Sequence, residues 1–191
     1  MKSILTAILA SFFALLPGSN ALAEQGLGME VELRGGHNYS KWDKGKNKFQ
    51  TNEVRLGASK QLGDLPLSLG LSVGKTNVVA LQDELGRFEG YDVSAEAKAW
   101  LPEKVTGSEN FKPFVRVAHT VYSNTEIRGF GEKLRGKDDG LTAGIGAAYN
   151  LTDSTAASLE YSYKCKTMDI KGLGKDPYKS HGVALGLAHT L

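Results

Sequence analysis

The chain has 191 residues, of which 41% are hydrophobic, 8% aromatic and 23% charged, and its formal net charge is +2. So small a charge gives no basis for nucleic-acid binding. The single cysteine, Cys165, excludes an intramolecular disulfide and makes a cysteine-based metal site not credible. We expect neither a metal nor a cofactor.

The N-terminus has the three parts of a secretory signal peptide. Lys2 supplies a positive charge, residues 4–16 form an apolar stretch, and an Ala-Leu-Ala cleavage site lies at 21–23. The apolar stretch is short for a membrane helix, which needs about 20 residues. We therefore expect residues 1–23 to be cleaved as a signal peptide and residues 24–191 to form one domain.

Polar and apolar residues alternate through the rest of the chain, and alternation is the period of a β-strand. The clearest case is 67–76, where leucines and a valine alternate with serines and glycines. No helical period competes with this pattern. It predicts eight strands, at about residues 27–39, 49–62, 67–76, 89–101, 113–123, 140–151, 155–166 and 182–191.

The predicted connections alternate between long polar segments and tight turns, apart from a longer one at 102–112. The long segments are 40–48, 77–88, 124–139 and 167–178, and the tight turns are 63–66 and 152–154. An even number of strands of about ten residues with this alternation is typical of an outer-membrane barrel. The sequence predicts an all-β fold, an eight-stranded antiparallel up-and-down transmembrane β-barrel.

One face of the predicted strands is mainly Leu, Val and Ala, and the other carries charges. A membrane barrel turns its apolar face to lipid and its polar face inward, whereas a soluble lipocalin-like barrel does the reverse and is the alternative. Charges inside a barrel must pair, because a buried charge without a partner is costly. The predicted lumen charge network is Glu30, Glu32, Arg34, Glu53, Arg55, Asp92, Glu96, Lys98, Arg116, Glu160 and Lys164.

An eight-stranded barrel is just wide enough for side chains to fill its interior. Trp100 and Phe114 share the inner face with Arg116, so we expect a plugged lumen. A narrow conduit, opened when a salt bridge exchanges partners, is the alternative.

Two segments resemble a known family: Gly144-x-Gly146-Ala147-x-Tyr149-x-Leu151-Thr152 and Leu159-Glu160-Tyr161-x-Tyr163, followed by an alternating strand to the C-terminus. They are similar to the small eight-stranded outer-membrane β-barrel superfamily that includes the OmpA transmembrane domain, OmpX, Ail and the opacity proteins. The resemblance implies an outer-membrane location in a Gram-negative cell envelope. It also implies that the last strand pairs with the first and carries the signal read by the barrel-insertion machinery. That assembly signal is Val183, Leu185, Leu187 and Leu191, with Leu191 where the family usually has phenylalanine.

Four histidines, His37, His119, His181 and His189, lie on the predicted lipid-facing side. Some enzymes of the resembled superfamily act on lipids with a histidine close to a serine. Here His119 and Ser123 are four residues apart, about 13 Å on one face of an unbulged strand. A histidine at that distance cannot activate a serine. We therefore expect no catalytic residue, with a lipid-modifying enzyme as an alternative.

The long connections are rich in basic residues, notably Lys41, Lys44, Lys46, Lys48, Arg128, Lys133, Arg135 and Lys137. Phosphates of lipopolysaccharide or host glycosaminoglycans are plausible electrostatic partners for such loops. The leading hypothesis is a non-enzymatic outer-membrane protein that serves envelope integrity or surface interaction. Its expected partners are outer-membrane lipids, lipopolysaccharide, the barrel-insertion machinery and a possible surface ligand at the loops.

Overall fold

The computed structural model describes residues 29–43, 48–81, 87–129 and 132–191. The predicted signal peptide, residues 1–23, and its cleavage site lie outside these ranges. Within them, no helix is both long and apolar enough to cross a membrane.

The described residues form eight strands and one short helix. The elements are β1 (Met29–Trp42), β2 (Lys48–Gln61), β3 (Leu67–Leu81), β4 (Arg87–Trp100), α3 (Glu103–Thr106), β5 (Phe111–Gly129), β6 (Glu132–Asn150), β7 (Thr155–Ile170) and β8 (Gly174–Thr190). Each strand pairs antiparallel with its neighbours in sequence, and β1 also pairs with β8, so the sheet is a closed barrel. The predicted fold class is confirmed.

The seam between β1 and β8 is continuous. The register runs from Glu30 opposite Thr190 to Trp42 opposite Tyr178. Beyond it, the backbone N–H of Leu191 donates to the carbonyl of Met29 at 2.9 Å. The alternating C-terminal segment is therefore the strand that closes the barrel, as the pattern predicted.

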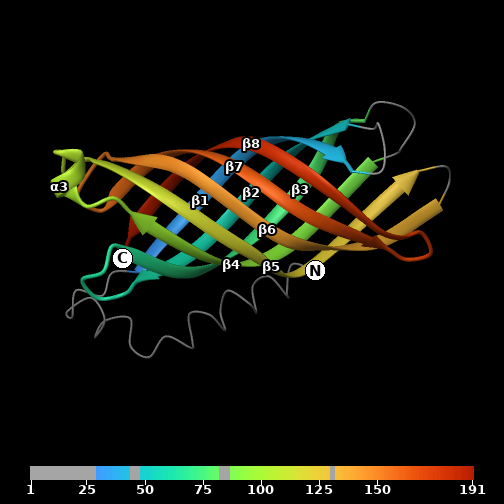
Figure 1. Ribbon diagram of the computed structural model, residues 1–191, viewed down its shortest axis with the longest axis horizontal. Coiled ribbons are helices and arrows are strands. Elements are labelled where there is room, and N and C mark those ends of the chain that lie inside the picture. The colour runs from blue at the N-terminus through green and yellow to red at the C-terminus, as the bar shows by residue number, and fades with distance from the viewer. Residues whose placement is uncertain (1–28, 44–47, 82–86, 130–131) are drawn as a thin grey trace.

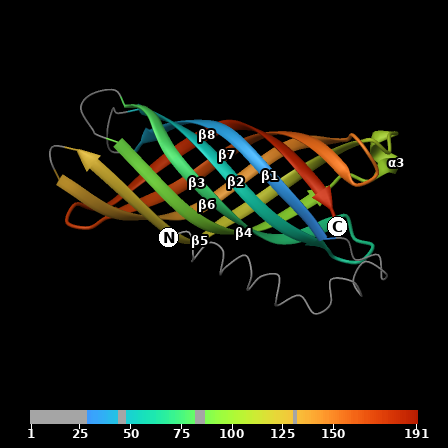
Figure 2. The same ribbon diagram turned by 180° about the vertical axis from the view of Figure 1, so that it is seen from behind.

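The two ends of the barrel differ (Figure 1). The turns after β2 and β6, the helix α3 and Leu191 lie at one end, which we call the α3 end. The opposite end, which we call the distal end, holds the turn between β7 and β8 and the facing ends of the other strands. Figure 2 shows β1, β2 and β3 running side by side along the barrel from one end to the other.

The predicted strand lengths of about ten residues were wrong. The strands have 14 to 19 residues, and most of the predicted loops 124–139 and 167–178 are strand. These segments were predicted to be loops because they contain many charged residues. A strand that extends past the membrane faces water on its outer side, however, so it can carry charges there.

Side-chain burial follows the predicted alternation. Leu185 is 67% exposed and Ile145 is 62% exposed on the outside of the barrel, whereas Glu32 and Arg34 are each 5% exposed inside it. A soluble barrel that holds an apolar ligand would have the opposite arrangement. The apolar outer surface suits lipid.

Candidate functional site: the barrel lumen

The lumen is closed near the α3 end by Lys98 and two aromatic rings. The Lys98 ammonium contacts Glu30 at 3.0 Å and Glu32 at 2.9 Å. It also lies 4.8 Å from the ring centroid of Trp100 and 5.3 Å from that of Phe114. The two rings pack edge to face at 5.2 Å. This combination of ion pairs and cation–π contacts leaves Lys98 with partners on several sides.

Four charges of alternating sign form the next layer. Arg34 donates to both carboxylate oxygens of Glu96 at 2.7 Å, and Arg116 donates to both oxygens of Glu160 at 2.5 and 2.8 Å. Two longer contacts close the set, Arg116 to Glu96 at 3.3 Å and Arg34 to Glu160 at 3.7 Å. Arginine–carboxylate pairs that share two hydrogen bonds are the strongest and most directional ion pairs.

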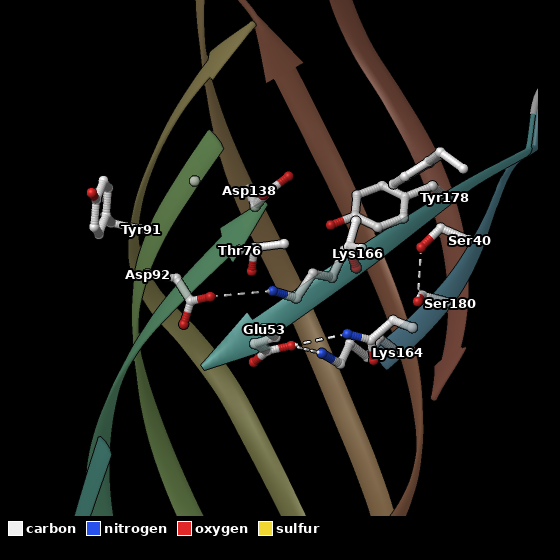
Figure 3. A pocket seen from close by; sticks show the side chains of 14 residues that line it. Ser40, Glu53, Thr76, Tyr91, Asp92, Asp138, Lys164, Lys166, Tyr178 and Ser180 are labelled. Atoms are coloured by element: carbon white, nitrogen blue, oxygen red, sulfur yellow. Dashed lines mark hydrogen bonds and ion pairs between the residues drawn. The ribbon is translucent and has the colours of Figure 1, made fainter. Parts of the chain in front are cut away.

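A third layer lies toward the distal end, and Figure 3 shows four of its charged side chains, Glu53, Asp92, Lys164 and Lys166. Arg55 contacts both oxygens of Asp92 at 2.7 and 2.9 Å, and its Nε donates to Glu53 at 2.7 Å. Lys164 forms an ion pair with the same Glu53, and Lys166 approaches Asp92 at 3.9 Å. The side chains come from β2, β4 and β7, so this layer spans the barrel.

Each of the eleven charges proposed for the lumen has an oppositely charged neighbour within 4.0 Å. The pairs join Glu30, Glu32, Arg34, Glu53, Arg55, Asp92, Glu96, Lys98, Arg116, Glu160 and Lys164 in three layers. Most of them are buried, so removing one member weakens the charge compensation of its partners.

Sequence reasoning missed two further charges, Lys166 and Asp138. Lys166 is the last residue of the predicted strand 155–166 and has the same parity as Lys164, so this parity could have identified it. Asp138 was assigned to a loop, but it lies on β6, where Thr125 donates to its Oδ2 at 3.2 Å. Its Oδ1 is buried without a hydrogen-bond partner among the described residues.

Glycines provide the space that the arginines and glutamates occupy. A Cβ built on Gly74 would lie 2.6 Å from Nη2 of Arg55. A Cβ on Gly186 would lie 2.8 Å from Oε1 of Glu32. The small residues on the inner face therefore give room to specific charged neighbours.

The distal end of the lumen is closed by an apolar cluster. Phe49, Met168 and Tyr178 are buried, Met168 completely, and Trp42 packs against them. The ring centroid of Trp42 lies 5.4 Å from that of Phe49 and 5.2 Å from that of Tyr178. We call these four residues the distal cap. They were not identified from the sequence, because most of them were placed in loops or at strand ends.

Two cavities show how the lumen is filled. One, beside Asp92 and Asp138, has a volume of about 30 Å³, which is room for very few water molecules. The other, of about 550 Å³, lies at the α3 end and is bordered by Trp100, Glu30 and Asn110.

The four histidines, His37, His119, His181 and His189, all lie on the outside of the barrel and are exposed. Ser123 lies inside, because a bulge in β5 next to Ser94 leaves Val121 and Tyr122 both facing outward. The Ser123 hydroxyl donates to the carbonyl of Asp138 at 2.7 Å. His119 Nδ1 contacts the carbonyl of Gly140 at 3.2 Å. His119 and Ser123 are thus on opposite sides of the wall and form no catalytic pair.

The proposed assembly-signal residues lie together on the outer face of β8 and just beyond it. Val183, Leu185, Leu187 and Leu191 are 50–67% exposed. Among the described residues, no three His, Cys, Asp or Glu side chains are grouped so as to hold a metal ion.

Comparison with known proteins places this arrangement among outer-membrane barrels. Residues 5–189 match the family model described as outer membrane protein beta-barrel domain. The structure of neisserial surface protein A superposes with a TM-score of 0.68 at 13% identity, covering 84% of this chain and 96% of that one. A search of curated protein sequences finds no significant match.

Two other solved structures with this fold have different descriptions. The attachment invasion locus protein Ail of Yersinia pestis gives a TM-score of 0.55 at 15% identity, covering 86% of this chain and 99% of that one. The outer membrane enzyme PagL gives 0.50 at 11% identity, covering 81% of this chain and 97% of that one. At these identities the likeness establishes the fold alone.

Proposed function

Because the chain belongs to the outer membrane protein β-barrel domain family, we propose that it is a non-enzymatic barrel with a plugged lumen. Its role is envelope integrity or surface interaction. In such barrels the short turns face the periplasm and the long connections face outward. The α3 end is then periplasmic and the distal end extracellular. Signal-peptide cleavage at 23 and insertion by the barrel-insertion machinery, guided by β8, belong to the same proposal.

The observation that carries this proposal is the series of closures along the lumen. Lys98 with its aromatic neighbours, the layers around Arg116 and Arg55, and the distal cap follow one another from end to end. Water-filled channels belong to barrels of about 16 strands or more. A filled interior supports a structural role, with specific interactions made by the outer surface and the distal end.

Planar bilayer recording tests the plug. We expect the purified barrel to give no resolved conductance steps. The double variant Lys98→Ala, Phe114→Ala removes only one of the closures, so it should also give no resolved conductance steps. Regular openings of the unmodified protein, with a defined ion selectivity, would instead favour a conduit.

One observation favours that second candidate, a narrow conduit. Lys166 contacts Asp92 only at 3.9 Å, and the nearby Asp138 has a carboxylate oxygen without a partner. A lysine that moved between the two carboxylates would change the path through this layer. Asp138→Asn would remove the second carboxylate, and conductance that persisted unchanged in this variant would argue against such a switch.

The lipid-modifying enzyme is tested through His119. Its Nε2 lies 3.9 Å from Asp139 on the outer surface, but Ser123 lies inside the barrel. We expect lipid A mass spectra from cells with the wild-type protein and with His119→Ala to be identical. A lipid product that disappears in the variant would contradict the non-enzymatic proposal.

A further inference from the structure

Three lysines form a row on the outside of the barrel at its distal end. Lys41 on β1 is directly opposite Lys48 on β2 and directly opposite Lys179 on β8. All three side chains are exposed on the outer face. Figure 2 shows the strands β1 and β2 next to each other, and the register of β1 with β8 places Lys179 on the other side of Lys41. We call this set the lysine row.

The protein neutralises this row only in part. Lys179 contacts Asp43 at 3.6 Å, and Lys48 lies 5.9 Å from the ring centroid of Tyr39. Lys41 forms no ion pair within the described ranges. Side chains directly opposite on neighbouring strands have Cβ atoms about 5 Å apart, and like charges in such pairs destabilise the sheet. An anion held between the lysines would remove this repulsion.

From the lysine row toward the middle of the barrel, the outer surface becomes less polar, as a lipid does from its headgroup to its acyl chains. Directly toward the barrel middle come Tyr39 and His181, whose ring centroids are 5.4 Å apart. Further along the same strands lie Val183, Leu185 and Leu33, all at least half exposed. Tyrosine and histidine suit the interfacial level of a membrane, and the aliphatic residues suit its hydrocarbon.

On β3, the strand next to β2, a lysine has a carboxylate and an aromatic ring close to it. There Lys75 on β3 contacts Glu89 at 3.7 Å and lies 5.5 Å from the ring centroid of Tyr91. Glu89 in turn is opposite Glu126 on β5. Lys75 is thus paired with a carboxylate of the next strand, whereas Lys41 has no ion pair within the described ranges.

We propose that the lysine row binds a phosphorylated lipid of the outer leaflet. The phosphate groups lie between Lys41 and its two neighbours, and the acyl chains lie along Val183, Leu185 and Leu33. A phosphorylated lipid is favoured because the row adjoins the apolar belt, where a soluble anion would gain nothing from the leucines. This inference rests on the proposed function only in requiring that the barrel spans the outer membrane.

The experiment measures lipid binding to the purified barrel by native mass spectrometry. The probes are a diphosphorylated glucosamine-based glycolipid, the same lipid without phosphate, and inorganic pyrophosphate. A lysine near an anionic lipid surface contributes about fivefold to binding. We therefore expect the triple variant Lys41→Gln, Lys48→Gln, Lys179→Gln to bind the diphosphorylated lipid about a hundredfold more weakly.

The controls are Lys75→Gln on β3, outside the lysine row, and Lys60→Gln near the α3 end, both of which should bind as the wild type does. Heat-dependent gel mobility verifies that each variant is folded. If the triple variant does not fold, Lys41→Gln alone should weaken binding about fivefold, and Lys41→Arg should retain it.

The inference is overturned by equal binding of the phosphorylated and dephosphorylated lipids, by an unchanged affinity of the triple variant, or by pyrophosphate that binds as tightly as the lipid. These results leave the plugged barrel intact, since its test is conductance. Conversely, a conducting barrel that still binds the lipid through the row would refute only the plug.

Discussion

The charged layers and the distal cap fill the same lumen with opposite chemistry. Around Arg116 and Arg55 the inner side chains are ionised and paired, and the outer side chains are aliphatic. Around Met168 the inner side chains are apolar, while outer neighbours such as Lys179 are charged. The change occurs along single strands without any change of parity. Whether lipid or water surrounds the barrel wall thus decides which of its two faces is apolar.

This difference predicts that substitutions in the two regions lower the stability of the barrel for different reasons. In the charged layers the apolar outer side chains face lipid, so the stability of the interior depends on charge pairing. In the distal cap the interior behaves as the core of a soluble protein and depends on packed volume. The following substitutions test the two regions against each other.

Arg116→Ala should have the largest effect. It leaves Glu160, which is 3% exposed, without its two short hydrogen bonds. Breaking a buried pair typically costs about 3–5 kcal/mol. Urea unfolding in lipid vesicles measures this loss. The exchange Arg116→Glu with Glu160→Arg should recover part of it, and a single variant as stable as wild type would contradict the paired network.

Met168→Ala should cost about 3 kcal/mol, because the completely buried thioether would leave a cavity. We expect the loss to be confined to the distal end. Protease cleavage of that end should accelerate while the heat-dependent gel mobility of the barrel is kept. If the whole barrel unfolds at the temperature at which the distal end becomes cleavable, the two regions are one cooperative unit.

Lys98→Met should be milder, at about 2 kcal/mol, because Glu30 is partly exposed and Glu32 keeps its longer contact with Arg34 at 3.7 Å. Methionine retains the length of the side chain between Trp100 and Phe114. The free energy of unfolding should recover when Glu32→Gln is added. No recovery would mean that packing between the rings, rather than charge, accounts for the contribution of Lys98.

Gly74→Ala should have the smallest effect, about 1 kcal/mol, because the new methyl group forces the Arg55 guanidinium to shift. The matched control is Gly35→Ala, where nothing lies within 4 Å of the added Cβ. We expect equal melting temperatures for Gly35→Ala and the wild type. A Gly74→Ala barrel as stable as the control would show that the Arg55 layer adapts freely.

The sequence predicted the parts of the fold that depend on period and on membrane polarity. Alternation located the eight strands, and the parity of Glu96 or Arg116 located the inner face. It failed where polarity reverses at constant parity, as at Met168 and Tyr178, which were read as loop. It also failed at Ser123, because the bulge at Val121 changes the parity of β5 and no residue type announces it. Asp138 was missed because its segment of β6 was predicted to be a loop. The pairing of particular charges depends on register across strands that are distant in sequence, and composition does not encode it.

The seam between β1 and β8 has a consequence for the timing of assembly. Most pairs in the barrel join neighbouring strands, and they can form in sequence order. The partner of β1 on its other side is the strand made last of the eight. Until β8 has crossed into the periplasm, any partial sheet keeps two unpaired edges, and such edges invite association with other chains. Assembly therefore has to wait for the whole set of strands, and a pause after β7 would expose the nascent protein to aggregation.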